Sequence, residues 1–330
     1  MLRVLELFAG IGACSKALER LGIEHEIVDA VEIDKYAVAS FNAVHGTNFE
    51  PQDITKWDKD LQVDLIMHGS PCQDFSVAGK GAGGDEGSGT RSSLLYETLR
   101  IVEKLRPKYV IWENVKNLLS KKHVHNWNAY AERMEEMGYT NYCQVLNAKD
   151  YGVPQNRERV FTVSILGDGG FSFPPKQPLI KRLKDVLEPE VDEKYYLSDK
   201  QVDMLLAPNF GQNKRFYDPR ADGLTNTITS VQKDNFVAMP DTAYCVDANY
   251  HKGTTLKGYV EKHRRQLIPD SYRIRKLTPR ETWRLMGFDD VDFEKAEKVN
   301  SNTQLYKQAG NSIVVNVLEA ILGRLLDGNI

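Results

Sequence analysis

The 330-residue sequence lacks the cysteine pattern of a metal site or of a disulfide-bonded protein. Its four cysteines, Cys14, Cys72, Cys143 and Cys245, are far apart, and none belongs to a CxxC pair. No apolar run approaches the roughly 18 residues of a membrane helix, and the first residues, MLRVLELFAG, lack the features of a signal peptide. We therefore expect reduced thiols, no bound metal and a cytoplasmic protein.

The chain also has little net charge, −3, so its overall composition gives no indication of a polyanionic partner. The charge is unevenly distributed, because ten Lys and Arg face three acidic residues between Lys252 and Met286. A locally basic region suits nucleic acid, although a solvated basic face explains it equally well.

Short apolar runs alternate with helical patterns in the first half of the sequence. The runs predict strands at VLELF, EIVDAV, VDLIM, YVIWE and VFTVSI. Apolar spacing predicts helices at 15–21, 35–44, 93–105 and 126–137. Strands separated by helices favour a parallel α/β sheet, whose ligands bind at the carboxyl ends of the strands.

The alternation stops at FSFPPKQP, residues 171–178, where prolines cluster. From there to about residue 273 no long helical pattern occurs, which favours a smaller, irregular or β domain. Residues 312–326 are strongly apolar with helical spacing and predict a core helix.

The first predicted strand runs into FAGIGACSKAL, with Gly10 and Gly12 at the turn before a helix. Glycines at such a turn let a ligand approach the backbone, although tight packing of helix on strand explains them about as often. The third glycine of the dinucleotide fingerprint is absent, because Ser15 occupies its place. A pyrophosphate is therefore disfavoured.

Two acidic residues follow the next predicted strands. Glu32 lies about 20 residues after the glycine turn, where an acid can bind the hydroxyls of a ribose. Asp53 begins a DI pair before a helix-like stretch. Each alone is more simply a surface residue or a helix cap, but together they indicate a pocket for a nucleoside without phosphate, and S-adenosylmethionine fits that description.

The stretch GSPCQDFSVAGKG places Cys72 after a predicted strand and before a loop with many glycines. A lone cysteine in that position is more often a small buried hydrophobe. The glycines that follow favour a mobile lid over a reactive thiol instead. They are Gly79, Gly81, Gly83, Gly84, Gly87 and Gly89.

Candidate partners of the thiol occur in two later motifs. The strand YVIWENV ends with Glu113, whose carboxyl group suits a proton donor beside a nucleophile. In QNRER, Arg157 and Arg159 alternate along an extended segment and should point to the same side. This motif is either a solvated charged turn or a pair of guanidinium groups that bind a carbonyl or phosphate oxygen.

Taken together, these motifs resemble the DNA (cytosine-5)-methyltransferase family over nearly the entire chain. The resemblance implies a Rossmann-like S-adenosylmethionine-dependent methyltransferase fold, in which a mixed sheet has helices on both faces. It also implies a smaller target recognition domain, whose sequence has no fixed family pattern. The motifs, in family order, are FAGIG, Glu32, Asp53 with Ile54, PCQ, TRSSL, ENV, QNRER, RKLTPRE with RLMGF, and YKQAGNSIVVNV.

The resemblance assigns the catalytic roles. Cys72 matches the nucleophile that adds to carbon-6 of cytosine, and Glu113 matches the group that binds the ring nitrogen N3. Arg159 matches the arginine at the cytosine carbonyl, with Arg157 nearby. The reaction requires a base flipped out of duplex DNA.

The cofactor contacts and the domain boundaries follow from the same resemblance. The positions matching the cofactor site are Phe8, Gly10, Gly12, Glu32, Ile33, Asp53, Ile54, Pro71, Leu94, Asn311 and Ile313. Ile33 departs from the family, because an aromatic residue often stacks on adenine there. The catalytic domain is expected at 1–185 and 300–330, and the recognition domain with its hinge at 186–299.

The expected DNA contacts lie in two segments of a monomeric protein. Gln73, Ser76 and Arg91 belong to the loop that closes on the base. Thr227 and Ile228 lie in TNTITSVQKDN, our candidate for the loop that reads the target sequence, although an ordinary β-turn region is as good an explanation.

Three other interpretations are weaker. An RNA methyltransferase of the same fold usually carries a CysPheThr tripeptide ahead of the RKLTPRE-like motif, and none occurs here. An inactive DNA-binding paralogue need not retain Cys72, Glu113 and Arg159 together. A nicotinamide dehydrogenase is disfavoured by the missing third glycine and by the PCQ loop.

Overall fold

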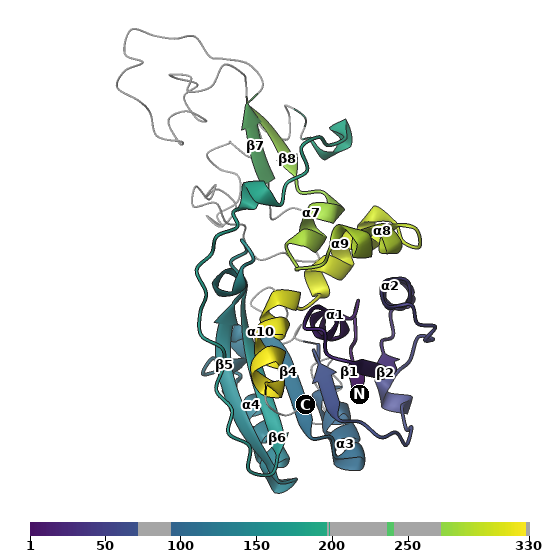
Figure 1. Ribbon diagram of the computed structural model, residues 1–330, viewed down its shortest axis with the longest axis vertical. Helices are drawn as coiled ribbons and strands as arrows, with labels where there is room; N and C mark the ends of the chain where they lie inside the picture. The colour runs from purple at the N-terminus through teal and green to yellow at the C-terminus, as the bar shows by residue number, and fades with distance from the viewer. Residues whose placement is uncertain (72–93, 197, 199–235, 241–271, 328–330) are drawn as a thin grey trace, which may run out of the picture.

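A computed structural model describes residues 1–71, 94–196, 198, 236–240 and 272–327; for 236–240 and 272–274 it describes the backbone alone. Its centre is a six-stranded sheet in the order β2-β1-β3-β4-β6-β5 (Figure 1). The strands are β1 Leu2–Leu7, β2 His25–Val31, β3 Leu65–His68, β4 Tyr109–Val115, β5 Tyr139–Asn147 and β6 Glu158–Leu166.

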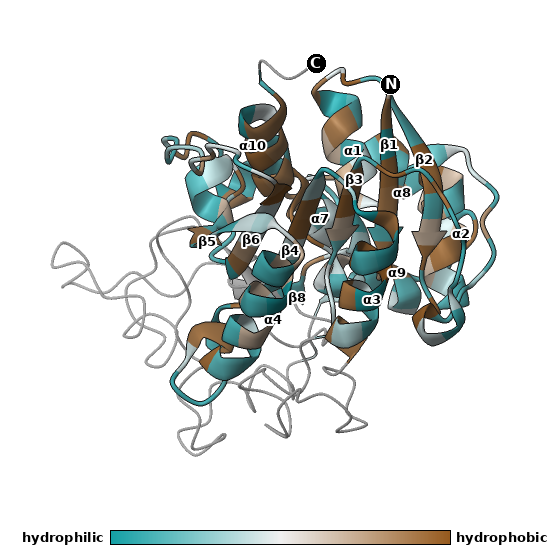
Figure 2. Ribbon diagram, turned by 90° about the horizontal axis from the view of Figure 1, so that it is seen from below, coloured by the Kyte–Doolittle hydropathy of each residue, from teal (hydrophilic) through white to brown (hydrophobic). Residues whose placement is uncertain are grey.

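Helices cover both faces of this sheet, and each face has its own core (Figure 2). Alternation along β1 sends Val4 into one core and Leu5 into the other, because successive side chains of a strand point to opposite faces. Helices α1 and α10 cover the face of Val4, and α3 and α4 cover the face of Leu5. The helices are α1 Ala13–Arg20, α2 Lys35–His45, α3 Leu95–Leu105, α4 Val124–Glu136 and α10 Val315–Leu326.

The predicted fold class, a mixed sheet with helices on both faces, is confirmed. The parallel sheet expected from the alternation of strands and helices holds only for β1 to β4. Strand β6 is antiparallel to β4 and to β5. Strand β5 was not predicted, because this edge strand is half-exposed and lacks a continuous apolar run. Only ten residues separate β5 from β6, too few for a crossover helix, so the two strands form a hairpin.

The C-terminal part of the chain returns to the sheet through three further helices: α7 Pro279–Arg284, α8 Asp290–Glu297 and α9 Asn302–Asn311. Residues 302–326 are long and apolar enough to cross a membrane by length and composition, but 56% of the apolar window is buried inside the protein. The stretch contains two helices, because residues 312–314 interrupt it. Its apolar side chains therefore form core, as predicted for residues 312–326. The described 3-10 turns are η1 Ile54–Lys56, η3 Lys116–Leu119, η4 Ala148–Tyr151, η5 Leu183–Asp185 and η6 Glu193–Tyr195.

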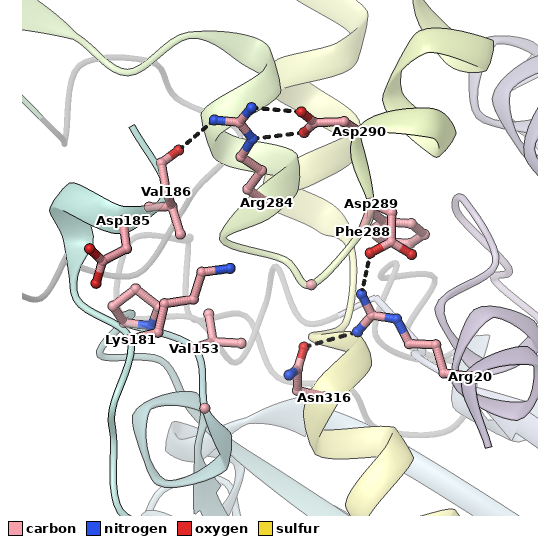
Figure 3. A pocket seen from close by; sticks show the side chains of 13 residues that line it. Arg20, Val153, Lys181, Asp185, Val186, Arg284, Phe288, Asp289, Asp290 and Asn316 are labelled. Atoms are coloured by element: carbon pink, nitrogen blue, oxygen red, sulfur yellow. Dashed lines mark hydrogen bonds and ion pairs between the residues drawn. The ribbon is translucent and has the colours of Figure 1, made fainter. Parts of the chain in front are cut away.

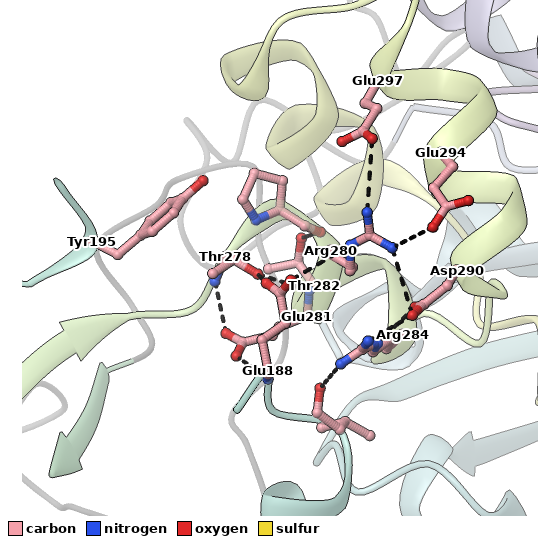
Figure 4. A network of polar contacts seen from close by, with 12 residues as sticks. Glu188, Tyr195, Thr278, Arg280, Glu281, Thr282, Arg284, Asp290, Glu294 and Glu297 are labelled. Atoms are coloured by element: carbon pink, nitrogen blue, oxygen red, sulfur yellow. Dashed lines mark hydrogen bonds and ion pairs between the residues drawn. The ribbon is translucent and has the colours of Figure 1, made fainter. Parts of the chain in front are cut away.

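A two-stranded hairpin, β7 Phe236–Pro240 with β8 Tyr272–Lys276, lies beyond α7 and away from the central sheet (Figure 1). Glu281 of α7 joins it to the core: its carboxylate accepts two hydrogen bonds from Arg275 of β8, at 2.8 and 2.9 Å. The same carboxylate accepts the backbone N–H of Thr278 and that of Glu188, both at 2.8 Å (Figure 4). The buried side chain of Glu281 thus connects α7 to strand β8 and to the segment around Glu188.

Glu281→Gln is expected to destabilise the fold by about 3 to 5 kcal/mol, because it leaves the buried Arg275 guanidinium without its counter-charge. Arg275 and Glu281 have only 2% and 0% of their side chains exposed, so water cannot replace the lost carboxylate. Urea denaturation measures the change. Glu136→Gln is the control, since its pair with Arg133 is exposed and its loss should cost less than about 0.5 kcal/mol. Equal stabilities of the two variants would contradict this account of the junction.

Candidate active site

The site lies at the carboxyl edge of the parallel strands. Strands β1, β3 and β4 run parallel, so the segments that follow β1 and β3 and the end of β4 meet at this edge. The segment after β1 begins at Phe8, the segment after β3 begins at Gly69, and Glu113 lies near the end of β4. Chain topology therefore brings together three of the motifs that the sequence singled out.

The turn after β1 has a backbone that few other residues would adopt. Phe8, Gly10 and Gly12 all have positive φ, at 53°, 57° and 80°. A Cβ on Gly12 would lie 2.1 Å from Nε2 of His45, so packing against α2 requires glycine there. A Cβ on Gly10 would meet no atom within 4 Å, so its backbone borders open space. Gly12 therefore serves packing, and Gly10 lies where a ligand can approach.

Glu6, which the sequence analysis did not single out, fills the N-terminus of α1. Its buried carboxylate accepts a hydrogen bond from Ser15 N at 3.0 Å and another from the Ser15 hydroxyl. Burial raises the pKa of Glu6 to about 7. The N–H groups that would bind a pyrophosphate in a dinucleotide site are thus occupied by the protein's own side chain. This arrangement explains the missing third glycine and disfavours a nicotinamide dinucleotide.

Glu32, at the end of β2, has its carboxylate oriented by two backbone donors. Gly10 N donates to Oε2 at 3.1 Å, and Asp34 N donates to Oε1 at 2.9 Å. Burial raises the pKa of Glu32, and these two hydrogen bonds oppose the increase. Beside it, Ile33 is 69% exposed, although most large apolar side chains of the described chain are buried. An oriented acid and an exposed apolar side chain lie side by side at this end of the sheet.

Asp53 and Ile54 face different environments. Asp53 caps the turn η1, Ile54–Lys56, and accepts hydrogen bonds from Thr55 N at 3.0 Å and Thr55 Oγ1 at 2.8 Å. These bonds lower the pKa of Asp53, so the side chain stays ionised. Ile54 is buried in the core with Trp57. The structure therefore leaves Asp53 near solvent and assigns the side chain of Ile54 to packing.

Segments far apart in the sequence complete the edge. Ile313, just before α10, lines a small cavity together with Glu113, Arg157 and Arg159. Asn311 is exposed at the end of α9. Pro71 and Leu94, both half-buried, flank residues 72–93. Ile313, which the resemblance assigned to the cofactor site, thus lies beside Glu113.

Glu113 and Arg159 form an ion pair, with Arg159 Nε 3.1 Å from Glu113 Oε1. The residues lie on the paired strands β4 and β6, and only 9% of Glu113 is exposed. Burial raises the pKa of Glu113, whereas the nearby charges of Arg159 and Arg157 lower it. The site therefore holds a carboxyl group whose protonation depends on the position of an arginine.

Arg157 has a different set of contacts from Arg159, although both line the same cavity as the alternation predicted. Its guanidinium donates to the backbone oxygens of Ser312 at 2.8 Å and Gly310 at 3.3 Å. It thereby fixes the segment that carries Ile313, which sequence spacing did not indicate. The cavity is about 10 Å³, roughly the space of one water, so a pyrimidine requires side chains to move.

A buried network precedes residue 72. Ser70 Oγ accepts a hydrogen bond from Trp112 Nε1 at 2.9 Å, and Ser70 O accepts one from Asn114 Nδ2 at 3.3 Å. The two donors flank Glu113 on β4 and therefore fix the segment before residue 72 relative to Glu113. Ser70 and Trp112 were not predictable from the sequence, because a serine and a buried tryptophan carry no motif of their own.

Six predicted site residues lie outside the described residues: Cys72, Gln73, Ser76, Arg91, Thr227 and Ile228. Within the described part of the chain, no group of three or more His, Cys, Asp or Glu side chains is placed to bind a metal.

A larger cavity, about 220 Å³, lies between α10 and the turn from α7 to α8 (Figure 3). Its arginines are already paired, Arg20 with Asp289 at 2.7 Å and Arg284 with Asp290 at 2.6 Å. None of the predicted site residues lines it. The cavity is therefore distinct from the candidate active site.

Known proteins that are similar to this chain include a protein family and several methyltransferases. The profile described as "C-5 cytosine-specific DNA methylase" matches residues 2–327. Type II methyltransferase M2.ScrFI of Lactococcus lactis subsp. cremoris is 38% identical over 98% of this chain and 99% of its own length. Type II methyltransferase M.Bsp6I of Bacillus sp. (strain RFL6) is 34% identical over 97% of both chains.

Two solved structures share the fold. The Dnmt2 methyltransferase of S. pombe is similar with a TM-score of 0.69 and 21% identity, over 99% of each chain. A putative DNA modification methyltransferase encoded within an E. coli prophage is similar with a TM-score of 0.63 and 22% identity, over 99% of each chain. At these identities the similarity concerns the fold alone.

Proposed function

Because this chain belongs to the C-5 cytosine-specific DNA methylase family, we propose how its residues carry out the reaction of that family. The protein is a DNA (cytosine-5)-methyltransferase, which adds a methyl group to carbon-5 of cytosine. The observation that supports the assignment of roles best is the buried pair of Glu113 and Arg159, next to the strand edge where Cys72 follows β3.

S-adenosylmethionine fits the carboxyl edge of β1 and β2 as methyl donor. Glu32 would accept hydrogen bonds from the ribose hydroxyls, and Ile33 would contact adenine. The ionised Asp53 would accept a hydrogen bond from an amino group of the ligand. The backbone at Gly10 leaves room for the ligand, and Glu6 at the N-terminus of α1 favours a nucleoside without phosphate. The donor supplies an electrophilic methyl group, which carbon-5 of an unmodified cytosine is too weak a nucleophile to attack.

The protein overcomes that weakness by covalent catalysis. The Cys72 thiolate bonds to carbon-6 of a flipped-out cytosine while Glu113 gives a proton to N3, so that carbon-5 becomes nucleophilic. After methylation the carbon-5 proton passes to solvent, the bond from carbon-6 to sulfur breaks to release the Cys72 thiolate, and N3 returns its proton to Glu113. Arg159 holds the cytosine carbonyl, and Arg157 fixes the segment around Ile313 that borders the base.

The ion pair must open before cytosine binds, since the cavity is too small for the base. When Arg159 turns from Glu113 to the cytosine carbonyl, the positive charge that lowers the pKa of Glu113 moves away. Burial then favours the protonated carboxyl group that N3 needs. Binding of the base would thus favour the protonated form of Glu113, which donates to N3.

Target recognition belongs in this proposal to residues 186–299, with catalysis at 1–185 and 300–330. Gln155 Nε2 donates to Leu285 O at 2.7 Å and Lys16 pairs with Asp292 at 3.1 Å, and these two contacts support a junction between the two parts. We also propose that the protein acts on double-stranded DNA in the cytoplasm of a bacterial or phage-infected cell, and that it acts as a monomer. Light scattering of the protein with and without duplex tests the monomeric state.

Bisulfite sequencing of plasmid DNA from cells that express the protein tests the function. We expect protected cytosines in one recurrent sequence context, and none in cells with the empty vector. Replacing residues 194–273 by the same segment of a relative with another target should change that context. Methylation confined to RNA would contradict the assignment and support the RNA methyltransferase alternative.

A further inference from the structure

The loop from Gln52 to Lys59, which carries Asp53 and η1, is held from one side by Asp29 of β2. This carboxylate is 1% exposed and was not singled out by any sequence motif. Gln52 Nε2 donates to Oδ1 at 2.8 Å, and Trp57 Nε1 and Lys59 Nζ donate to Oδ2 at 2.8 and 2.7 Å. Its contacts reach both ends of the loop.

Both carboxylate oxygens of Asp29 accept hydrogen bonds. Ala30 N also donates to Oδ1 at 3.0 Å, so each oxygen accepts two hydrogen bonds. Lys59 is a half-exposed cation that balances the buried charge, and together these donors lower the pKa of Asp29. An ionised side chain therefore fits this position, whereas an amide has only one oxygen to accept hydrogen bonds.

The loop is also held at two other points. Gln52 N donates to Glu32 O at 2.8 Å, which ties the start of the loop to the residue proposed to bind ribose. From α3, Arg100 Nη2 donates to Ile54 O at 3.1 Å and to Trp57 O at 2.8 Å. Asp53 thus sits on a short segment whose position relative to Glu32 is set by buried and partly buried polar contacts.

We propose that Asp29 is a positioning residue for the cofactor, which sets the distance between Asp53 and Glu32 without touching the ligand itself. The inference rests on the proposed S-adenosylmethionine site. It follows from the placement of the four donors, because Gln52 immediately precedes Asp53 and Trp57 closes the turn that Asp53 caps.

Asp29→Asn tests the proposal with a change of nearly the same size. An amide has one acceptor oxygen, so its NH₂ group would face either Trp57 and Lys59 or Gln52 and Ala30, all of which are donors. The loop must shift to relieve that conflict. Isothermal titration of the full-length protein with S-adenosylhomocysteine should then show an affinity about tenfold weaker, a loss of roughly 1.4 kcal/mol.

Asp64→Asn is the matched control. Asp64 is another well-bonded carboxylate, which accepts Arg3 N at 2.9 Å and Arg3 Nε at 3.0 Å. It immediately precedes β3 and so lies at the amino edge of the sheet, away from the site. Its replacement should lower the melting temperature and leave the affinity within twofold.

The outcomes separate this inference from the proposed function. Affinity of Asp29→Asn within twofold of the unaltered protein, or an equal loss in Asp64→Asn, overturns the positioning role. If Asp29→Asn does not fold, Gln52→Leu removes one contact and should weaken binding about threefold; unchanged affinity there overturns it as well. Absence of binding by the unaltered protein would overturn the proposed cofactor, and with it this inference.

Discussion

A Cys72→Ser protein is expected to form no denaturation-resistant adduct with a duplex that carries 5-fluorocytosine at the target. The unaltered protein should be trapped on the same duplex when S-adenosylmethionine is present, because fluorine cannot leave carbon-5 as a proton does. A serine hydroxyl is scarcely ionised near neutral pH and adds poorly to carbon-6. Turnover should fall by about 10⁴-fold or more.

Denaturing gel electrophoresis of the protein–DNA mixture measures the adduct. Cys143→Ser is the control, since Cys143 is a free thiol of β5 whose pKa is raised by burial and which should not act as a nucleophile. Its adduct should form normally. An adduct in Cys72→Ser would mean that another residue attacks the base.

Glu113→Gln is expected to lower the methyl-transfer rate by about 10² to 10⁴-fold, the usual range for loss of a general acid. The amide keeps the shape of the side chain but has no acidic proton for N3. Affinity for S-adenosylmethionine should hardly change, because Glu113 faces the cavity of Arg159 rather than the segment with Glu32. Single-turnover rates with saturating DNA measure the effect.

The pH dependence has a definite direction. Burial raises the pKa of Glu113, so the protonated form persists to higher pH than in a free carboxylic acid, and the rate should fall as pH increases through that pKa. Glu113→Gln should lose this decrease. Glu158→Gln is the control, since its exposed side chain pairs with Lys116 and faces away from the chemistry. A Glu113→Gln rate within a few-fold of the unaltered rate would show that another group activates the ring.

The sequence by itself determined the family to which this protein belongs. Motifs such as PCQ, ENV and QNRER occur in a fixed order, and each depends only on residue type and spacing. The strands β1, β3 and β4 were equally predictable, because a buried parallel strand is a largely apolar run, whichever partner it pairs with. The missing third glycine disfavours a pyrophosphate, and the position of Glu6 at the N-terminus of α1 agrees with that prediction.

Only the tertiary structure decided which of these residues meet. Sequence spacing placed Arg157 and Arg159 on one side of an extended segment. In the structure Arg159 forms an ion pair with Glu113, whereas Arg157 donates a hydrogen bond to the backbone oxygen of Ser312. Edge strand β5 was not predictable from periodicity, because its half-exposed side chains do not form an apolar run. The sheet is mixed because β6 pairs antiparallel with both β4 and β5. Asp29 gave no signal either, since a buried carboxylate is defined by its donors, and three of its four donors come from a loop more than 20 residues away. Local sequence encodes burial and residue chemistry, whereas the partner of a polar group is set by the long-range packing that surrounds it.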